Sequence, residues 1–378
     1  MKKRILISPN SFKECADSVS IAELIRDNLS HLKDTELIIK PISDGGDGFL
    51  NVCGFNFGGE IRKYSISTAY DNSLFECPVL YCEKRREIYI ESAEVVGIKI
   101  VPLVFRNPLK LTSRGLGALL IKIESDIQSK RINAEKVYVG IGGTATIDMG
   151  MGMMAELGLK LFDASGKELN VIPDIFHLAK AIDYNPMRFS FELIPVVDVT
   201  NSLLGPQGGI RVFGAQKNAN ETMISTLEEK FNHLLKLFEN NGLEIFSMSL
   251  SGAGGGIPAA FQIFYKTALL NSSEFIGNNL GIQKYTSDVE YLITGEGAFD
   301  SQSNFGKGAG VLIDLYKDKV QRIFLLCGRI SDEMINLLPK NVYFIEMSKY
   351  FSTEEESISN YKEGISNSCK DIVKELNF

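Results

Sequence analysis

The sequence has few of the residues on which metal centres and acid–base sites most often depend. It holds three histidines, two of which, His31 and His233, lie in amphipathic helical patterns. A zinc site or a histidine-based catalytic triad is therefore not expected. The six cysteines are scattered and form no C-x-x-C pair, which favours reduced thiols and a cytoplasmic protein.

Long apolar runs and an excess of positive charge are also missing. The longest apolar run, "VVGIKIVPLVF", contains a lysine and a proline and is much shorter than the roughly 18 residues of a membrane helix. The opening "MKKRILISPNSFKE" has too short an apolar core for a signal peptide. The net charge of -7 argues against a nucleic-acid binder, but anionic small molecules need only a local positive pocket.

The pattern of apolar segments predicts two domains. The N-terminus alternates "RILIS", the helical "SVSIAELIRDNLSHL" and "ELIIKPIS", and the last third resumes with "VEYLIT", "RIFLLC" and "VYFIEMS". This alternation is typical of parallel strands. The middle suggests short antiparallel strands that turn at Asp71–Asn72. We predict an α/β fold in which residues 1–60 and 285–378 form one α/β domain, and residues 61–284 form a second α/β domain inserted between them.

Unusually polar loops follow four of the expected strands, where ligands gather in open α/β sheets. Carboxylates beside glycines suit a Mg²⁺ ion that enters with nucleotide phosphates, and lysines supply point charges against those phosphates. Ordinary turns and helix caps would explain any one of these loops but explain all four together less well. The loops hold Asn10, Ser11 and Lys13; Asp44 and Asp47; Asp198 and Asn201; and Glu296, Asp300 and Lys307, while Lys217 is a further candidate cation.

Two glycine-rich stretches suggest phosphate binding by backbone amides. They are "KVYVGIGGTATIDMGMGMM" and "SLSGAGGGIPAAF", and neither is a Walker A loop, because no G-x-x-x-x-G-K-[ST] segment occurs. The first also matches G-x-G-x-x-A, with Asp163 at roughly the distance of a ribose-binding acid, so a nicotinamide-dependent dehydrogenase is an alternative. Threonine, isoleucine and glycine make a poor first helical turn for that reading.

Taken together and in order, these segments resemble the bacterial type I glycerate kinase (glycerate 2-kinase) family over nearly the whole chain. The matching segments are "PNSFK" (9–13), "PISDGGDG" (41–48), "TSRGLG" (112–117), "GIGGTATIDMG" (140–150), "DVTNSLLG" (198–205), "FGAQKN" (213–218), "GAGGG" (252–256) and "TGEGAFDSQSNFGKG" (294–308).

The resemblance implies a kinase that transfers the γ-phosphoryl group of ATP to D-glycerate with Mg²⁺. The implied product is 2-phosphoglycerate, with 3-phosphoglycerate as the alternative. It also implies two α/β domains with the active site in the cleft between them: one flavodoxin-like or Rossmann-like with a parallel sheet, the other a distinct, mixed α/β insertion. The expected partners are glycerate and ATP, without nucleic acid or membrane, and a homodimer is left open.

We hypothesise site roles on this basis. Asp44 or Asp198 would orient and deprotonate the acceptor hydroxyl or bind Mg²⁺, and Lys13 would neutralise the glycerate carboxylate or the transferring phosphoryl group. The expected metal ligands are Asp198, Glu296 and Asp300. The remaining expected residues are Asn10, Ser11, Asp47, Asn201, Gly45 and Gly46 for glycerate, and Gly142, Gly143, Thr144, Gly254, Gly255, Gly295, Glu296 and Lys307 for the nucleotide.

Several positions depart from the family pattern. Asn10 replaces the usual Asp, Asp47 the usual Glu, Ile147 the usual Asn and Met149 the usual Gly, and Ala298 occupies a commonly basic position. Compared with the family pattern, Asn10 lacks the negative charge of the usual Asp. Ala298 lacks the basic group that would contact a phosphate. These changes leave two further alternatives, a phosphotransferase for another small hydroxy acid and a non-catalytic ligand-binding homologue.

Overall fold

The computed structural model describes residues 2–12, 15–198, 201–245, 249–300 and 308–376. These fall into two compact units, Met1–Gly58 with Ser272–Phe378, and Gly59–Asn271. Each unit is described by itself. Among the described residues, no helix has the length and apolar character needed to cross a membrane.

The first unit is built on a five-stranded sheet with the order β13-β12-β11-β1-β2, in which every pair of neighbours is parallel. In chain order its elements are β1 (Lys3–Ile7), α1 (Ser18–Leu29), β2 (Thr35–Ile39), α2 (Phe49–Phe57), α9 (Ser272–Glu274), β11 (Tyr291–Phe299), α10 (Gly308–Tyr316), β12 (Arg322–Ile330), α11 (Asp332–Ile335), β13 (Val342–Glu346), α12 (Glu354–Ser359) and α13 (Tyr361–Glu375).

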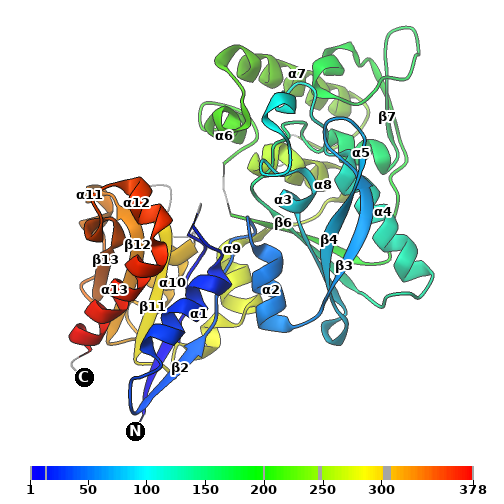
Figure 1. The fold of residues 1–378 in the computed structure, drawn as a ribbon. Helices are drawn as coiled ribbons and strands as arrows, with labels where there is room; N and C mark the ends of the chain where they lie inside the picture. The colour runs from blue at the N-terminus through cyan, green and yellow to red at the C-terminus, as the bar shows by residue number, and fades with distance from the viewer. Residues whose placement is uncertain (1, 13–14, 199–200, 246–248, 301–307, 377–378) are drawn as a thin grey trace. The chain divides into compact units, whose positions relative to one another are not determined.

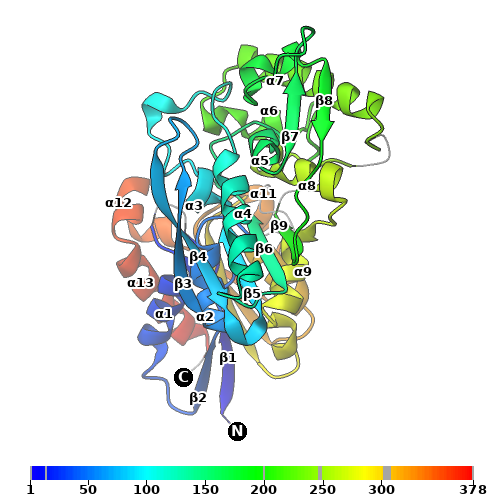
Figure 2. The ribbon, with the colours of Figure 1, turned by 90° about the vertical axis from the view of Figure 1, so that its right-hand side faces the viewer.

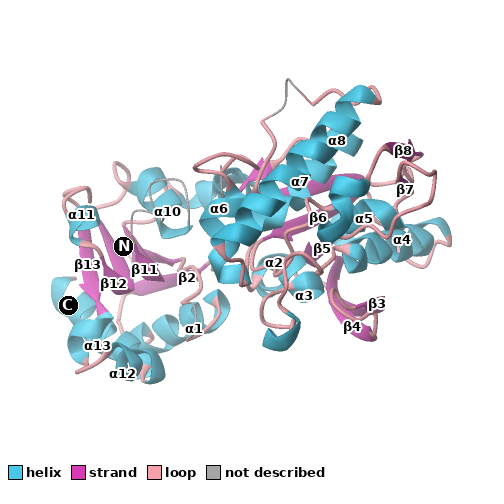
Figure 3. Cartoon of the chain, turned by 90° about the horizontal axis from the view of Figure 1, so that it is seen from above, coloured by secondary structure: helices cyan, strands magenta, loops and turns pink. Residues whose placement is uncertain are grey.

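Both faces of this sheet are covered, because successive side chains of a strand point to opposite faces. Ile5 and Ile7 share a buried cluster with Ile25 of α1 and Ile372 of α13, while Leu6 between them is equally buried. Figure 3 shows α1 and α13 on one side of the sheet and α10 on the other. The predicted parallel-sheet domain is confirmed as the fold of this unit.

The second unit contains a six-stranded mixed sheet with the order β10-β9-β6-β5-β4-β3 and a separate two-stranded sheet of β7 and β8. Figure 2 shows α4 lying over one face of the larger sheet. The elements are β3 (Glu60–Ser67), β4 (Leu74–Cys82), β5 (Glu87–Glu91), α3 (Ser92–Val96), α4 (Arg114–Gln128), β6 (Lys136–Ile141), α5 (Met151–Glu156), β7 (Leu159–Phe162), β8 (Ala181–Tyr184), β9 (Glu192–Val197), α6 (Gly209–Gly214), α7 (Glu221–Asn240), α8 (Ile257–Tyr265) and β10 (Leu270–Asn271).

The direction of the strands changes along this sheet. The pairs β3–β4 and β4–β5 are antiparallel, as expected for the segment that turns at Asp71–Asn72. The pairs β5–β6, β6–β9 and β9–β10 are parallel. The carboxyl ends of β5, β6 and β9 therefore meet at one edge of the sheet.

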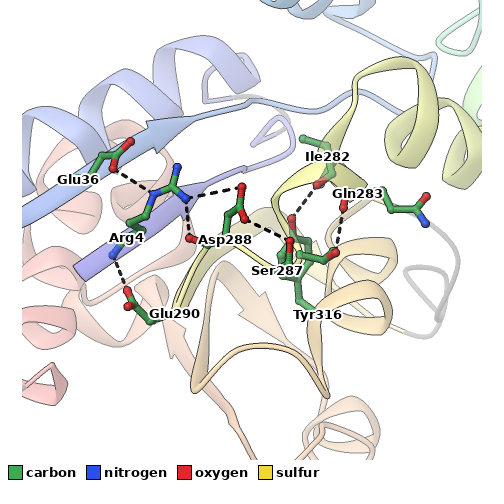
Figure 4. A network of polar contacts seen from close by, with 9 residues as sticks. Arg4, Glu36, Ile282, Gln283, Ser287, Asp288, Glu290 and Tyr316 are labelled. Carbon is green, nitrogen blue, oxygen red and sulfur yellow. Dashed lines mark hydrogen bonds and ion pairs between the residues drawn. The ribbon is translucent and has the colours of Figure 1, made fainter. Parts of the chain in front are cut away.

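Residues 272–284 group with the first unit, although we placed the second boundary near 285. Phe275 packs on Phe49 of α2 with ring centroids 5.2 Å apart. The buried hydroxyl of Tyr316 in α10 donates to the carbonyl of Ile282 at 2.8 Å (Figure 4). These contacts involve residues far apart in the sequence, so strand periodicity alone does not reveal them. Figure 1 shows the chain leaving the first unit after α2 and returning at α9.

Replacement of Tyr316 by Phe tests this anchor. Without the hydroxyl, the carbonyl of Ile282, a fully buried residue, loses the donor that ties it to α10, so we expect the free energy of unfolding to fall by about 1 kcal/mol in urea denaturation. Tyr291→Phe is the matched control, because the Tyr291 hydroxyl donates to Gln321 in an exposed position. Its expected loss is within about 0.5 kcal/mol, and equal losses in the two variants would contradict the assignment.

Candidate functional site

The first unit has a topological switch point between β1 and β11. If its strands are numbered along the chain, their spatial order is 2-1-3-4-5, so the connections from the two central strands run in opposite directions, and the crevice at such a point holds ligands in doubly wound folds. The pairing of the two segments continues past the end of β1. The amide of Ser8 donates to the carbonyl of Ile293 at 2.8 Å, and that of Asn10 donates to Gly295 at 2.8 Å.

Three polar side chains predicted from the sequence converge at this switch point. The side-chain amide of Asn10 donates to Oδ2 of Asp44 at 3.4 Å. A Cβ placed on Gly308 would lie 2.8 Å from Nδ2 of Asn10 and 2.7 Å from Oε2 of Glu296, so Asn10 and Glu296 meet at the start of α10. Asn10 is buried, whereas Asp44 and Glu296 are half-buried. A neutral amide thus stands beside two carboxylates that would otherwise repel each other.

The glycines that follow Asp44 shape its loop. Gly45 has a φ of 97° and Gly48 a φ of 86°, values that a residue with a Cβ rarely adopts. The amide of Gly46 donates to Oδ1 of Asp44 at 3.0 Å, and that of Gly45 donates to the Ser43 hydroxyl at 3.2 Å. The chain therefore folds around the carboxylate and holds it at the carboxyl-end edge of the sheet.

The structure describes four of the six other site residues that the sequence predicted in this unit. The amide of Ser11 donates to Oδ1 of Asn10 at 2.9 Å, and the half-buried Asp47 and Asp300 both have interaction partners. A Cβ on Gly295 would lie 1.9 Å from the carbonyl oxygen of Leu326, so this glycine is required by the packing of β11 against β12. Lys13 and Lys307 lie outside the described residues.

The glycine-rich loop after β6 leaves two backbone amides available. The amide of Gly142 donates to Ser92 Oγ at 3.1 Å. Ile98 donates to the carbonyl of Gly143 at 2.8 Å, and Ala145 donates to Val96 at 2.7 Å. Within the part of the chain that the structure describes, the amides of Gly143 and Thr144 donate to no protein acceptor. Gly143 is exposed, whereas Thr144 is 2% exposed, so the amide of Gly143 is the donor that this loop presents at the surface to phosphate oxygens.

A buried carboxylate, Asp148, holds the far end of this loop. Its Oδ2 accepts from the amide and the hydroxyl of Ser113, each at 2.7 Å, and from the amide of Gly152 at 3.1 Å, while Oδ1 accepts from Gly150 at 3.1 Å. Burial raises the pKa of Asp148, and the hydrogen bonds from Ser113 oppose that rise. Four donors aimed at one carboxyl group are the arrangement that favours its ionised form.

The ammonium group of Lys217 lies behind the same loop. It donates to Thr144 Oγ1 at 2.8 Å and to the carbonyl of Thr146 at 3.0 Å, and the residue is 6% exposed. Burial lowers the pKa of Lys217 to about 7, and the charge of Asp148 acts in the opposite direction. Lys217 contacts the loop from within the protein, whereas the sequence suggested a lysine facing phosphate directly.

The GAGGG segment packs its backbone against this loop. Gly254, Gly255 and Gly256 all have positive φ values, of 54°, 72° and 90°. A Cβ on Gly255 would lie 1.9 Å from the carbonyl oxygen of Thr146, and one on Gly254 would lie 2.5 Å from the side chain of Ile141. The glycines at these two predicted phosphate-binding positions are thus needed for close packing between two backbone segments.

Met149 replaces a glycine of the family pattern and adopts a glycine-like conformation. Its φ is 56°, which costs a residue with a side chain roughly 1–2 kcal/mol. Its amide donates to the carbonyl of Gly255 at 3.0 Å, and its side chain is fully buried. Met149 thus combines a left-handed backbone with a side chain that packs in the interior.

Asp198 and Asn201 follow β9 at the same sheet edge. Asp198 is half-buried and has interaction partners, while the side-chain amide of Asn201 donates to the carbonyl of Gln207 at 2.8 Å. Among the described residues, no group of three or more His, Cys, Asp or Glu side chains could hold a metal ion. Asp198 belongs to the second unit and Glu296 and Asp300 to the first, so the predicted set of metal ligands stays a prediction.

The local structure does not favour the dinucleotide-binding alternative. The helix after the loop, α5, begins only at Met151 and has six residues. Asp163 lies in an exposed turn, where its Oδ1 accepts from the amides of Ser165 at 2.8 Å and Lys167 at 3.0 Å. Asp163 therefore stabilises a turn and does not act as a ribose-binding acid.

The pairing of Ser113 with Asp148, and of Lys217 with Thr144, is the part of the arrangement that sequence reasoning missed. The residues occur in three segments that the resemblance had named, 112–117, 140–150 and 213–218. Their order along the chain was visible, but their contacts arise only from tertiary folding.

The lowered pKa of Lys217 predicts a specific pH dependence of stability. Its pKa lies near 7 in the folded protein and at its ordinary 10.5 in the unfolded chain, so only the unfolded chain binds the proton between these values. The free energy of unfolding should therefore rise with pH in this window relative to Lys217→Met, by up to about 1.4 kcal/mol per pH unit. Urea titrations of both proteins from about pH 7 to 10 measure this difference, and a pH-independent difference would contradict the assignment.

Comparisons with known proteins identify relatives of this chain. The profile of the Glycerate kinase family matches residues 5–377. The glycerate 2-kinase of Escherichia coli (strain K12) is 30% identical over 336 residues, which cover 88% of this chain and 86% of the relative. The glycerate kinase of Bacillus subtilis (strain 168) is 30% identical over 309 residues, covering 80% and 79% of the two chains.

A solved structure extends the similarity to the fold. The crystal structure of a protein assigned as glycerate kinase 2 from Salmonella typhimurium LT2 superposes with a TM-score of 0.77 at 26% identity, covering 99% of this chain and 98% of the other. Sequence and fold thus agree over almost the full length, and the chain belongs to the glycerate kinase family of kinases.

Proposed function

We propose that the protein transfers the γ-phosphoryl group of ATP to the 2-hydroxyl of D-glycerate and releases 2-phosphoglycerate and ADP. The observation that carries this proposal is the family match over residues 5–377. The choice of the 2-hydroxyl follows the name of the E. coli relative, glycerate 2-kinase. ATP is the cosubstrate that a kinase of this family implies.

In the proposed reaction the hydroxyl oxygen attacks the γ-phosphorus, and the bond from that phosphorus to the β–γ bridging oxygen breaks. The hydroxyl proton passes to a carboxylate, for which we propose Asp44 or Asp198. Asp44 is supported by its place at the switch point, its partial exposure and the turn that fixes it. We assign contacts with the acceptor to Asn10, Ser11, Gly45, Gly46, Asp47 and Asn201, and neutralisation of its charge to Lys13.

Catalysis of phosphoryl transfer rests on positioning the phosphates and stabilising their charge. We assign this role to the amides of Gly143 and Thr144, which lie after a parallel strand and donate to no protein acceptor among the described residues. We keep Gly142, Gly254, Gly255, Gly295, Glu296 and Lys307 as further proposed nucleotide-binding residues. Because Gly254, Gly255 and Gly295 are needed for close packing, we assign these three a supporting role.

The residues at the switch point fit a Mg²⁺ ion. Magnesium in nucleotide sites takes one or two carboxylates and keeps several waters. The half-buried Glu296 within β11 and the half-buried Asp300 directly after it carry carboxylate oxygens. We propose these two, together with Asp198, as its ligands. The ion would neutralise charge on the phosphate oxygens.

A phosphorus NMR spectrum tests the proposal directly. Purified protein incubated with Mg-ATP and D-glycerate should give a phosphomonoester at the position of 2-phosphoglycerate and an equal amount of ADP. An ester at the position of 3-phosphoglycerate would overturn the regiochemistry. Unchanged ATP would overturn the substrate assignment and direct attention to other hydroxy acids, with Asn10 and Ala298 as the residues to examine.

Asp44→Asn tests the proposed proton acceptor. The amide keeps the shape and the hydrogen bond from Gly46 but cannot take a proton, so kcat should fall by about 10²–10⁴-fold. Asp163→Asn is the control, because an asparagine Oδ1 preserves its exposed turn, and its turnover should match that of the unaltered protein. Near-normal turnover in Asp44→Asn would transfer the role to Asp198.

A further inference from the structure

Lys217 is a lysine at a buried position, where an apolar side chain would be buried at a lower cost in free energy. Burial of an ammonium group costs free energy unless its donors are used. Its nitrogen donates to the hydroxyl of Thr144 and the carbonyl of Thr146, at the middle of the loop after β6. The buried lysine therefore holds the conformation of that loop.

The loop is fixed at three places, and Lys217 supplies the central one. On one flank, the hydrogen bonds of Gly143 and Ala145 to Ile98 and Val96 turn the amide of Thr144 away from that segment. At the far end, Asp148 accepts from the amides of Gly150 and Gly152. Between these two places, Lys217 Nζ donates both to the hydroxyl of Thr144 and to the carbonyl of Thr146.

We propose that Lys217 is a positioning residue that holds the amides of Gly143 and Thr144 in the orientation that receives the phosphate tail of the nucleotide. This inference rests on the proposed kinase function. Lys217 acts through Thr144 and the Thr146 carbonyl and does not touch the ligand. Its loss should therefore weaken binding of ATP while the site for the acceptor keeps its affinity.

The matched control is a second buried lysine of the same unit. Lys230 is 8% exposed, against 6% for Lys217, and donates to the carbonyl oxygen of Asp174, in a segment separate from the loop. Lys230 also pairs with the Asp174 carboxylate at 3.5 Å. Lys230→Met thus removes a buried lysine with a hydrogen bond to a backbone carbonyl and an additional ion pair, so its structural cost should be at least as large. A purely structural contribution would affect Lys217→Met and Lys230→Met alike.

The experiment measures kcat, the KM for ATP and the KM for D-glycerate in five proteins: the unaltered chain, Lys217→Met, Thr144→Val, the double variant Lys217→Met/Thr144→Val, and Lys230→Met. Loss of the hydrogen bond between Lys217 and Thr144 predicts that KM for ATP rises about tenfold or more in Lys217→Met and in Thr144→Val. KM for glycerate should stay within about twofold in both, and Lys230→Met should keep both constants. The double variant should raise KM for ATP no further than Lys217→Met alone, because the two side chains act through one contact.

The outcomes separate this inference from the proposed function. Absence of glycerate phosphorylation by the unaltered protein would overturn the function. A normal unaltered enzyme with an unchanged KM for ATP in folded Lys217→Met, or equal effects in Lys217→Met and Lys230→Met, would overturn the inference alone. If Lys217→Met does not fold, Thr144→Val gives the decision, because it keeps the lysine and removes only the acceptor hydroxyl.

Discussion

Parallel pairing of strands is the constraint on which the rest of the structure depends. Parallel strands end at the same edge of a sheet, so the loops that follow them are brought together however far apart they lie in the sequence. In the first unit, this brings Asn10, Asp44 and Glu296 together. In the second, it aligns the loops after β6 and β9. Each unit therefore concentrates its polar side chains without needing a cluster of them in the sequence.

The second unit uses buried charge to shape a backbone loop. Asp148 gathers four donors, and Lys217 donates to a hydroxyl and a carbonyl. Buried ionic groups contribute little to net stability when compared with well-packed apolar residues. Their contribution is geometric: the loop that offers the amides of Gly143 and Thr144 cannot relax without leaving a buried polar atom unpaired.

The glycines of the two glycine-rich segments, the loop after β6 and the GAGGG segment, have different structural roles. Gly254 and Gly255 allow two backbones to approach so closely that a Cβ would overlap Ile141 or Thr146. Gly143, by contrast, is exposed and its amide donates to no acceptor among the described residues. A glycine-rich stretch in a sequence is compatible with either role, because both need the same absence of a side chain.

The sequence by itself determined the fold class, the parallel sheet of the first unit, the antiparallel start of the second and the family. These follow from apolar periodicity and from motifs that lie in fixed order, both of which are local properties of the chain. Only the tertiary structure decided that residues 272–284 join the first unit, that Asn10 meets Asp44 and Glu296, and that Lys217 supports Thr144 from within. These depend on contacts between segments distant in sequence, and no periodicity encodes which two loops will meet or from which side a lysine will approach.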